Sequence, residues 1–196
     1  KINNNTPIHI LEYIIKRKLE HMIDDLYYST DPQYKNLLII PFYYKNNLVG
    51  WSGRNTYSNN KKNRYVSNVQ PGYVYGLEKQ AYDYKFAIVT EGLIDSIHIN
   101  GIALLGSKIS SMQLSFIKNL NKPIIFVPDR DDKGKDMVDK ALYENWNVSL
   151  PEWDKSICDV SDAVEHYGKL TTFRTIVDSV YTSNTKIQLM KRYWFN

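Results

Sequence analysis

Acidic residues crowd one short segment of this sequence. The stretch FVPDRDDKGKD, residues 126–136, ends an apolar run and then places four aspartates close together, at positions 129, 131, 132 and 136. A second acidic pair, Glu91 and Asp95, follows the apolar run FAIVT, and a third, Asp159 and Asp162, lies in CDVSDAV. If these segments meet, each pair of like charges about 4 to 6 Å apart costs about 3 to 4 kcal/mol at an effective dielectric constant near 20. A bare site of this kind would be unstable.

Divalent cations would remove this repulsion. Clustered carboxylates without His or Cys favour Mg²⁺ or Mn²⁺, which keep several waters and bridge to phosphate oxygens. Two such ions about 4 Å apart can hold both the attacking and the leaving oxygen of a phosphoryl displacement. The acidic pattern therefore indicates metal-assisted phosphoryl or nucleotidyl transfer.

Two structural explanations compete with a metal site at residues 129–136. The aspartates could form a solvated turn whose charges favour the N-terminus of a following helix. A calcium-binding loop is excluded, because its fifth and twelfth positions would be Lys133 and Lys140. The metal interpretation is favoured because Glu91, Asp95, Asp129, Asp131 and Gly134 follow the ends of two predicted strands.

The second half of the chain predicts an α/β fold. Short apolar runs alternate with helical stretches, which is typical of a parallel sheet covered by helices on both faces. In such sheets, ligands bind beyond the carboxyl ends of the strands, where these acids lie. The expected strands are 86–90, 102–106, 124–128 and 148–151, the expected helices are near 92–100, 110–120 and 134–145, and the chain is expected to be helical from about residue 169 to its end.

The first half predicts a small basic α+β subdomain. Residues 1–84 carry 11 Lys and Arg against 7 Asp and Glu, whereas residues 85–196 carry 14 of each. A helix is expected with Thr6 as its N-cap and Pro7 in its first turn, followed by a β-hairpin at 37–44 and 48–54. RYVSN (64–68) and YVYGLE (73–78) are expected to be further short strands. The basic excess is a weak indication of nucleic-acid binding.

Composition excludes several other classes. A single cysteine excludes a disulfide framework, and four scattered histidines exclude a zinc cluster of the usual spacing. No run of about 18 apolar residues could span a membrane, and a secretory signal is absent from the printed sequence. We therefore expect no membrane partner and a cytoplasmic location.

These motifs resemble a known family. VTEGLIDSIHINGI and VPDRDDKGKD are similar to the two acidic motifs of TOPRIM domains, the nucleotidyl-transfer and hydrolysis module of bacterial-type primases, some topoisomerases and some nucleases. GWSGR, RYVSN and YVYGLEK resemble the basic subdomain of DnaG-type primases, and WDKSICDVSDAVEHYG is similar to a third acidic motif in primases of T-even-type bacteriophages. The resemblance covers about residues 36–170 and implies three segments: 1–84 as the basic primase subdomain, 85–168 as the TOPRIM domain and 169–196 as a C-terminal helical segment.

The resemblance also implies roles for individual residues. Glu91 would act as general base or join the metal cluster, and Asp129 and Asp131 would be catalytic metal ligands. Asp159 would bind metal too, with Asp95 and Asp162 in support, and the cluster would hold two or more Mg²⁺ or Mn²⁺ ions. The residues expected to contact nucleotide or DNA are Arg54, Arg64, Tyr65 and Lys108. Arg64 stands where the family usually has lysine, and the basic residue expected shortly before YGL is absent.

The function implied is that of a DNA-dependent RNA primase core, a nucleotidyltransferase of DNA replication. Its expected partners are a single-stranded DNA template, ribonucleoside triphosphates, a replicative helicase and a zinc-binding domain upstream in a longer protein. Without zinc ligands of its own, the chain should start primers poorly. Two alternatives stay open: a TOPRIM nuclease, which would not need the basic subdomain, and a non-catalytic DNA-binding clamp, which would not need intact acids.

Overall fold

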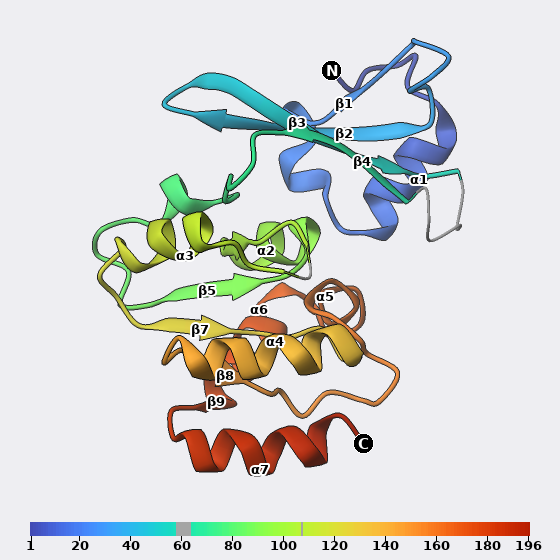
Figure 1. The fold of residues 1–196 in the computed structure, drawn as a ribbon. Coiled ribbons are helices and arrows are strands. Elements are labelled where there is room, and N and C mark those ends of the chain that lie inside the picture. The colour runs from blue at the N-terminus through green and yellow to red at the C-terminus, as the bar shows by residue number, and fades with distance from the viewer. Residues whose placement is uncertain (58–63, 107) are drawn as a thin grey trace. The chain divides into compact units, whose positions relative to one another are not determined.

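The chain folds as two compact units, Lys1–Pro71 and Gly72–Asn196. The computed structural model describes residues 1–57, 64–106 and 108–196 (Figure 1). Residues 72–84, which we predicted to belong to the first segment, therefore group with the second unit, as do residues 169–196. The functional division into 1–84, 85–168 and 169–196 stays a prediction.

The first unit is a small α+β structure. Its strands form an antiparallel sheet in the order β1-β2-β3-β4. Lys45 and Asn46 form the two-residue turn between β2 and β3, both with positive φ, as tight hairpins require. The hairpin predicted at 37–44 and 48–54 is therefore present. The elements are α1 (Ile8–Lys16), a 3₁₀ helix η1 (Glu20–Asp25), β1 (Tyr27–Tyr28), β2 (Leu37–Tyr44), β3 (Asn47–Asn55) and β4 (Tyr65–Val69).

The second unit contains the predicted parallel sheet. Its order is β6-β5-β7-β8-β9, and only the last pairing, β8 with β9, is antiparallel. The strands are β5 (Ala87–Thr90), β6 (Ile102–Ala103), β7 (Ile124–Phe126), β8 (Asn147–Ser149) and β9 (Val180–Tyr181). The helices are η3 (Leu77–Lys79), α2 (Leu93–Ile99), α3 (Ser111–Lys118), α4 (Asp132–Tyr143), α5 (Val160–Tyr167), α6 (Lys169–Asp178) and α7 (Asn184–Trp194).

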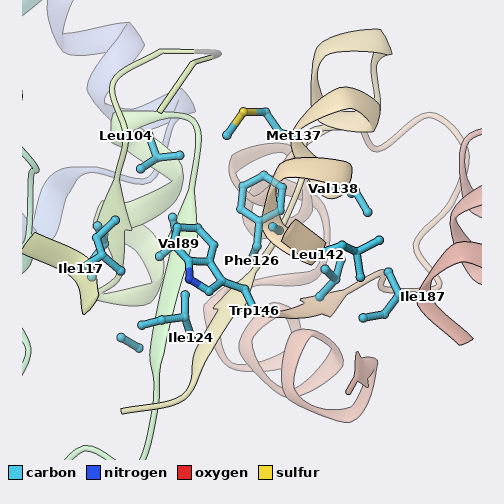
Figure 2. Packing of buried hydrophobic residues seen from close by; sticks show 14 of the residues in the cluster. Val89, Leu104, Ile117, Ile124, Phe126, Met137, Val138, Leu142, Trp146 and Ile187 are labelled. Atoms are coloured by element: carbon cyan, nitrogen blue, oxygen red, sulfur yellow. The ribbon is translucent and has the colours of Figure 1, made fainter. Parts of the chain in front are cut away.

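Helices cover both faces of this sheet, because its central strands are apolar on both sides. Side chains that alternate along β5 and β7 enter two separate cores. One core packs Val89 and Phe126 against α3, α4 and α7, and Figure 2 shows the side chains that fill it. The other packs Ile88 and Ile125 against α2, α5 and α6. The predicted α/β fold class, with a helix-covered parallel sheet after a small α+β subdomain and before C-terminal helices, is thereby confirmed.

Two predicted elements differ in the structure. YVYGLE is not a strand: Tyr75 makes a single bridge to Ala103, and Gly76, in the left-handed region at φ 78°, leads into η3. The C-terminal segment is not continuously helical, because Val180 and Tyr181 form β9 and pair with β8. A β-branched and an aromatic residue suit this edge position. No helix among the described residues is long and apolar enough to cross a membrane.

Candidate active site at the carboxyl edge of the parallel sheet

Glu91 and Asp129 lie at the ends of two adjacent parallel strands. In β5 and β7, Val89 is paired with Phe126, and the N–H of Val127 donates to the Val89 carbonyl oxygen over 2.9 Å. Both strands end within a few residues of this pair, so the acids that follow them reach the same edge. Glu91 is buried and Asp129 is half-buried. The structure therefore brings these two predicted site residues together.

Asp95 joins the same edge from α2 and links it to α5. Its carboxylate is buried, and Oδ1 accepts a hydrogen bond of 2.8 Å from the backbone N–H of Ser161. The other oxygen, Oδ2, lies so near Gly92 that a side chain at position 92 would collide with it. Gly92 thus makes room for the Asp95 carboxylate, which holds the start of α5 against the start of α2.

Three of the predicted acids also have structural roles at the starts of helices. Asp131 caps α4, because its Oδ1 accepts from the N–H of Gly134 at 2.8 Å. Asp159 caps α5, because its Oδ1 accepts from the N–H of Asp162 at 2.7 Å. The Asp162 carboxylate accepts from the N–H of Cys158 at 3.4 Å. The helix-start explanation for residues 129–136 is therefore correct in part, since capping accounts for one oxygen of Asp131.

The electrostatics are those of a cluster of buried and half-buried carboxylates. The pKa of Asp129 is raised to about 9, first by burial and then by the neighbouring carboxylates, in the order Asp95, Glu91, Asp159 and Asp131. Burial also raises the pKa of Glu91 to about 7, although the backbone N–H of Asp129 partly opposes this shift. Carboxylates from three separate segments of the chain therefore sense one another at this edge, and the cluster resists full ionisation.

The acidic side chains at this edge are of the type that binds a hard divalent cation, although those that the structure describes are not already arranged as a metal site. Every acidic donor here is a carboxylate oxygen, which is the ligand type that Mg²⁺ and Mn²⁺ prefer. Glu91 Oε1 is buried without a hydrogen-bond partner, as expected for an atom that another group would contact. Across residues 1–57, 64–106 and 108–196, no three His, Cys, Asp or Glu side chains are already arranged to hold a metal ion. Metal binding by these residues stays a prediction.

Gly134 shapes the segment that carries two of the acids. A side chain at this position would collide with the backbone carbonyl of Asp129, so only glycine lets α4 begin this close to the end of β7. We expect Gly134→Ala to destabilise the protein by about 2 kcal/mol or more, because the backbone itself must shift. Urea denaturation measures this, with Gly106→Ala as the control, since a side chain there meets nothing within 4 Å. Equal stability of the two variants would contradict this account of Gly134.

The residues predicted to contact nucleotide or DNA come from both units: Arg54, Arg64 and Tyr65 from the first, and Lys108 from the second. Arg54 and Tyr65 face each other across β3 and β4, and the guanidinium carbon of Arg54 lies 4.9 Å from the Tyr65 ring centroid. The Tyr13 ring of α1 lies 5.4 Å from the same carbon. Arg64 is half-buried beside Tyr65, and Lys108, in the second unit, is exposed. The contact with Tyr13 was not predicted, because its position on the helix gives no signal of a partner on β3.

Comparison with solved structures places this fold among known ones. The chain is similar to a structure of the DnaG catalytic core, with a TM-score of 0.69 and 17% identity over 90% of this chain and 74% of that one. It is similar to the Escherichia coli primase catalytic core, with a TM-score of 0.67 and 16% identity over 90% of this chain and 74% of that one. It is also similar to a DnaG primase catalytic domain bound to ssDNA, with a TM-score of 0.65 and 16% identity over 90% of this chain and 76% of that one. No protein-family model and no curated protein sequence matches the chain. At these identities the likeness establishes the fold, which is that of DnaG primase catalytic cores.

Proposed function

We propose that this chain is the catalytic core of a DNA primase, a nucleotidyltransferase that joins ribonucleotides on a single-stranded DNA template. The observation that carries the proposal is the convergence of Glu91, Asp95, Asp129, Asp131 and Asp159 at one edge of the parallel sheet, in which the pKa of Asp129 is raised to about 9. The fold, shared with DnaG primase catalytic cores, supports it. One such domain was solved bound to ssDNA, which supports the same template class here.

Glu91 is suited to accept the proton of the attacking 3′-hydroxyl group. With a pKa of about 7, it is poised near neutral pH, where a general base works best. Asp129, Asp131 and Asp159 would hold Mg²⁺ or Mn²⁺, with Asp95 and Asp162 in support. When bound, such ions would supply positive charge for the triphosphate oxygens. A relation to phage primases, an upstream zinc-binding domain and a replicative helicase partner belong to this proposal as expectations.

Arg54 is the best-defined candidate for phosphate binding. Its planar guanidinium lies near two tyrosine rings, which limit its rotation and leave its donors in a fixed orientation. We expect Arg54→Lys to weaken binding of a labelled ribonucleoside triphosphate about tenfold, because lysine keeps the charge but loses the two-point grip. Lys45→Ala, which removes a cation on the neighbouring hairpin turn, is the control. Unchanged affinity in Arg54→Lys would remove Arg54 from the site.

A primer-synthesis assay tests the proposal and separates it from the alternatives. We expect short RNA products from labelled ribonucleotides on single-stranded DNA with Mg²⁺ or Mn²⁺, with poor initiation that a short annealed RNA primer relieves. Cleavage of supercoiled DNA with no nucleotide consumption would favour the nuclease instead. DNA binding with neither activity, unchanged by loss of the acids, would favour the clamp. Either result would overturn the primase assignment.

A further inference from the structure

Arg130 lies between two of the candidate catalytic aspartates and ties their loop to another acidic segment. Its backbone N–H donates a hydrogen bond of 2.6 Å to the carbonyl oxygen of Cys158. Cys158 directly precedes Asp159, the cap of α5. The loop that carries Asp129 and Asp131 is therefore joined through its central residue to the loop that carries Asp159.

The side chain of Arg130 extends this link in two directions. Nη1 donates to the carbonyl oxygen of Asp154 at 2.9 Å, and both terminal nitrogens lie 3.5 Å from the carbonyl oxygen of Trp153. The guanidinium carbon also lies 4.3 Å from the ring centroid of Trp194, at the end of α7. One side chain thus contacts both the segment that leads to Asp159 and the C-terminal helix.

Trp194 is itself held firmly in place. It is buried, and its Nε1–H donates a hydrogen bond of 2.8 Å to the carbonyl oxygen of Pro151. Earlier in α7, Ile187 is fully buried, and the buried Lys191 contacts Asp139 of α4 at 2.6 Å. The helix is therefore anchored along its length, and the indole presents a fixed face to the guanidinium.

We propose that Arg130 and Trp194 form a clasp that sets the spacing between the Asp129–Asp131 loop and Asp159. The two are positioning residues: they hold the loops that carry the acids without contacting a substrate. Such a device is needed because the clustered carboxylates repel one another and, unrestrained, would push the two loops apart. The expected effect on catalysis rests on the proposed primase function. The restraint that the clasp places on the two loops does not depend on that function.

Conservative substitutions should break the clasp without unfolding the chain. Arg130→Lys keeps the positive charge but cannot stack as a plane on the indole while donating to two carbonyl groups. Trp194→Phe keeps an aromatic ring but loses the hydrogen bond to Pro151 and weakens the cation–π contact, since indole is the best partner for a cation. Both variants therefore act at the same contact from opposite sides.

Hydrogen exchange and Mn²⁺ binding provide the test. In the metal-free protein, we expect backbone amides of residues 129–131 and 158–159 to exchange about tenfold faster in both variants than in the unmodified protein. Mn²⁺ affinity, measured by electron paramagnetic resonance with the metal alone, should fall about tenfold, as is typical when groups behind metal ligands are changed. Trp146→Phe, in the core, and Arg174→Lys, on the surface of α6, are the controls and should leave both quantities unchanged.

The outcomes separate the clasp from the proposed function. Exchange rates in Arg130→Lys and Trp194→Phe equal to those of the unmodified protein would overturn the clasp. Equal acceleration of the same amides in Trp146→Phe would also overturn it, because the effect would then come from a general loss of stability. If the unmodified protein binds no Mn²⁺, the metal-dependent function fails, and the exchange rates alone decide whether the clasp exists.

Discussion

Asp129→Asn is expected to reduce primer synthesis by at least about a thousandfold, the largest effect of any single substitution in this site. Asparagine has nearly the same shape, but its amide cannot carry the negative charge that would hold a divalent cation beside Glu91 and Asp131. The same change should not harm folding, because the charge at position 129 is already disfavoured by burial and by its neighbours. Single-turnover extension of an annealed primer measures the effect without the initiation step.

Asp136→Asn is the matched control for this substitution. Asp136 is exposed on α4, more than one helical turn after the N-cap Asp131. It is therefore not part of the acidic edge. It should keep full activity under the same conditions. Extension by Asp129→Asn at a rate within tenfold of the unmodified protein would show that Asp129 does not take part in the chemistry.

The metal-free protein is expected to lose stability as the pH rises from 6 to 8. Asp129 has a folded pKa of about 9, against an ordinary value of 3.8. Between these values the unfolded chain has released the proton and the folded chain still binds it, so each rise in pH favours unfolding. The full effect of this one group over two pH units would be about 3 kcal/mol, and water around the half-buried carboxylate reduces it to about 1 kcal/mol. This corresponds to about 2 to 4 °C in Tm for a chain of this size.

Glu91 should add to this trend, since its folded pKa of about 7 is also raised above its ordinary value. Thermal unfolding at pH 6 and pH 8, with a chelator or with Mg²⁺, measures both contributions. Mg²⁺ should raise Tm more at pH 8 than at pH 6, because it binds the ionised carboxylates. Asp129→Asn should flatten the pH dependence, whereas Asp136→Asn should retain it. The assigned electrostatics would be contradicted if Tm rose with pH in the unmodified protein and rose to the same extent in Asp129→Asn.

The position of the acidic site was predictable because it depends on strand ends. Apolar runs of strand length marked β5 and β7, and parallel strands in such sheets end at one edge, so Glu91 and Asp129 had to approach each other. Gly134 could be recognised from its place after Asp129 and Asp131, although not the reason for it, which is close backbone packing against Asp129. Local sequence order was sufficient for this part of the structure.

Features that depend on tertiary contacts were not predictable in the same way. The edge strand β9 has only two residues, and the surrounding pattern is helical, so its pairing with β8 decides the structure. The contact between Arg130 and Trp194 joins residues far apart in the sequence, and nothing local to either residue indicates the other. The capping roles of Asp131 and Asp159 depend on the exact start of each helix, which sequence patterns locate only to within a few residues.

The most direct test of the account is a crystal soaked in Mn²⁺ together with a ribonucleoside triphosphate. Anomalous scattering would then locate manganese independently of any assumption about the ligands. We expect a peak at the edge of the sheet within bonding distance of Asp129 and at least one of Glu91, Asp131 and Asp159, with triphosphate oxygens completing the coordination. The contrary result would be a crystal at saturating Mn²⁺ that shows bound nucleotide but no manganese at this edge. It would contradict the claim that dications neutralise these carboxylates for phosphoryl chemistry.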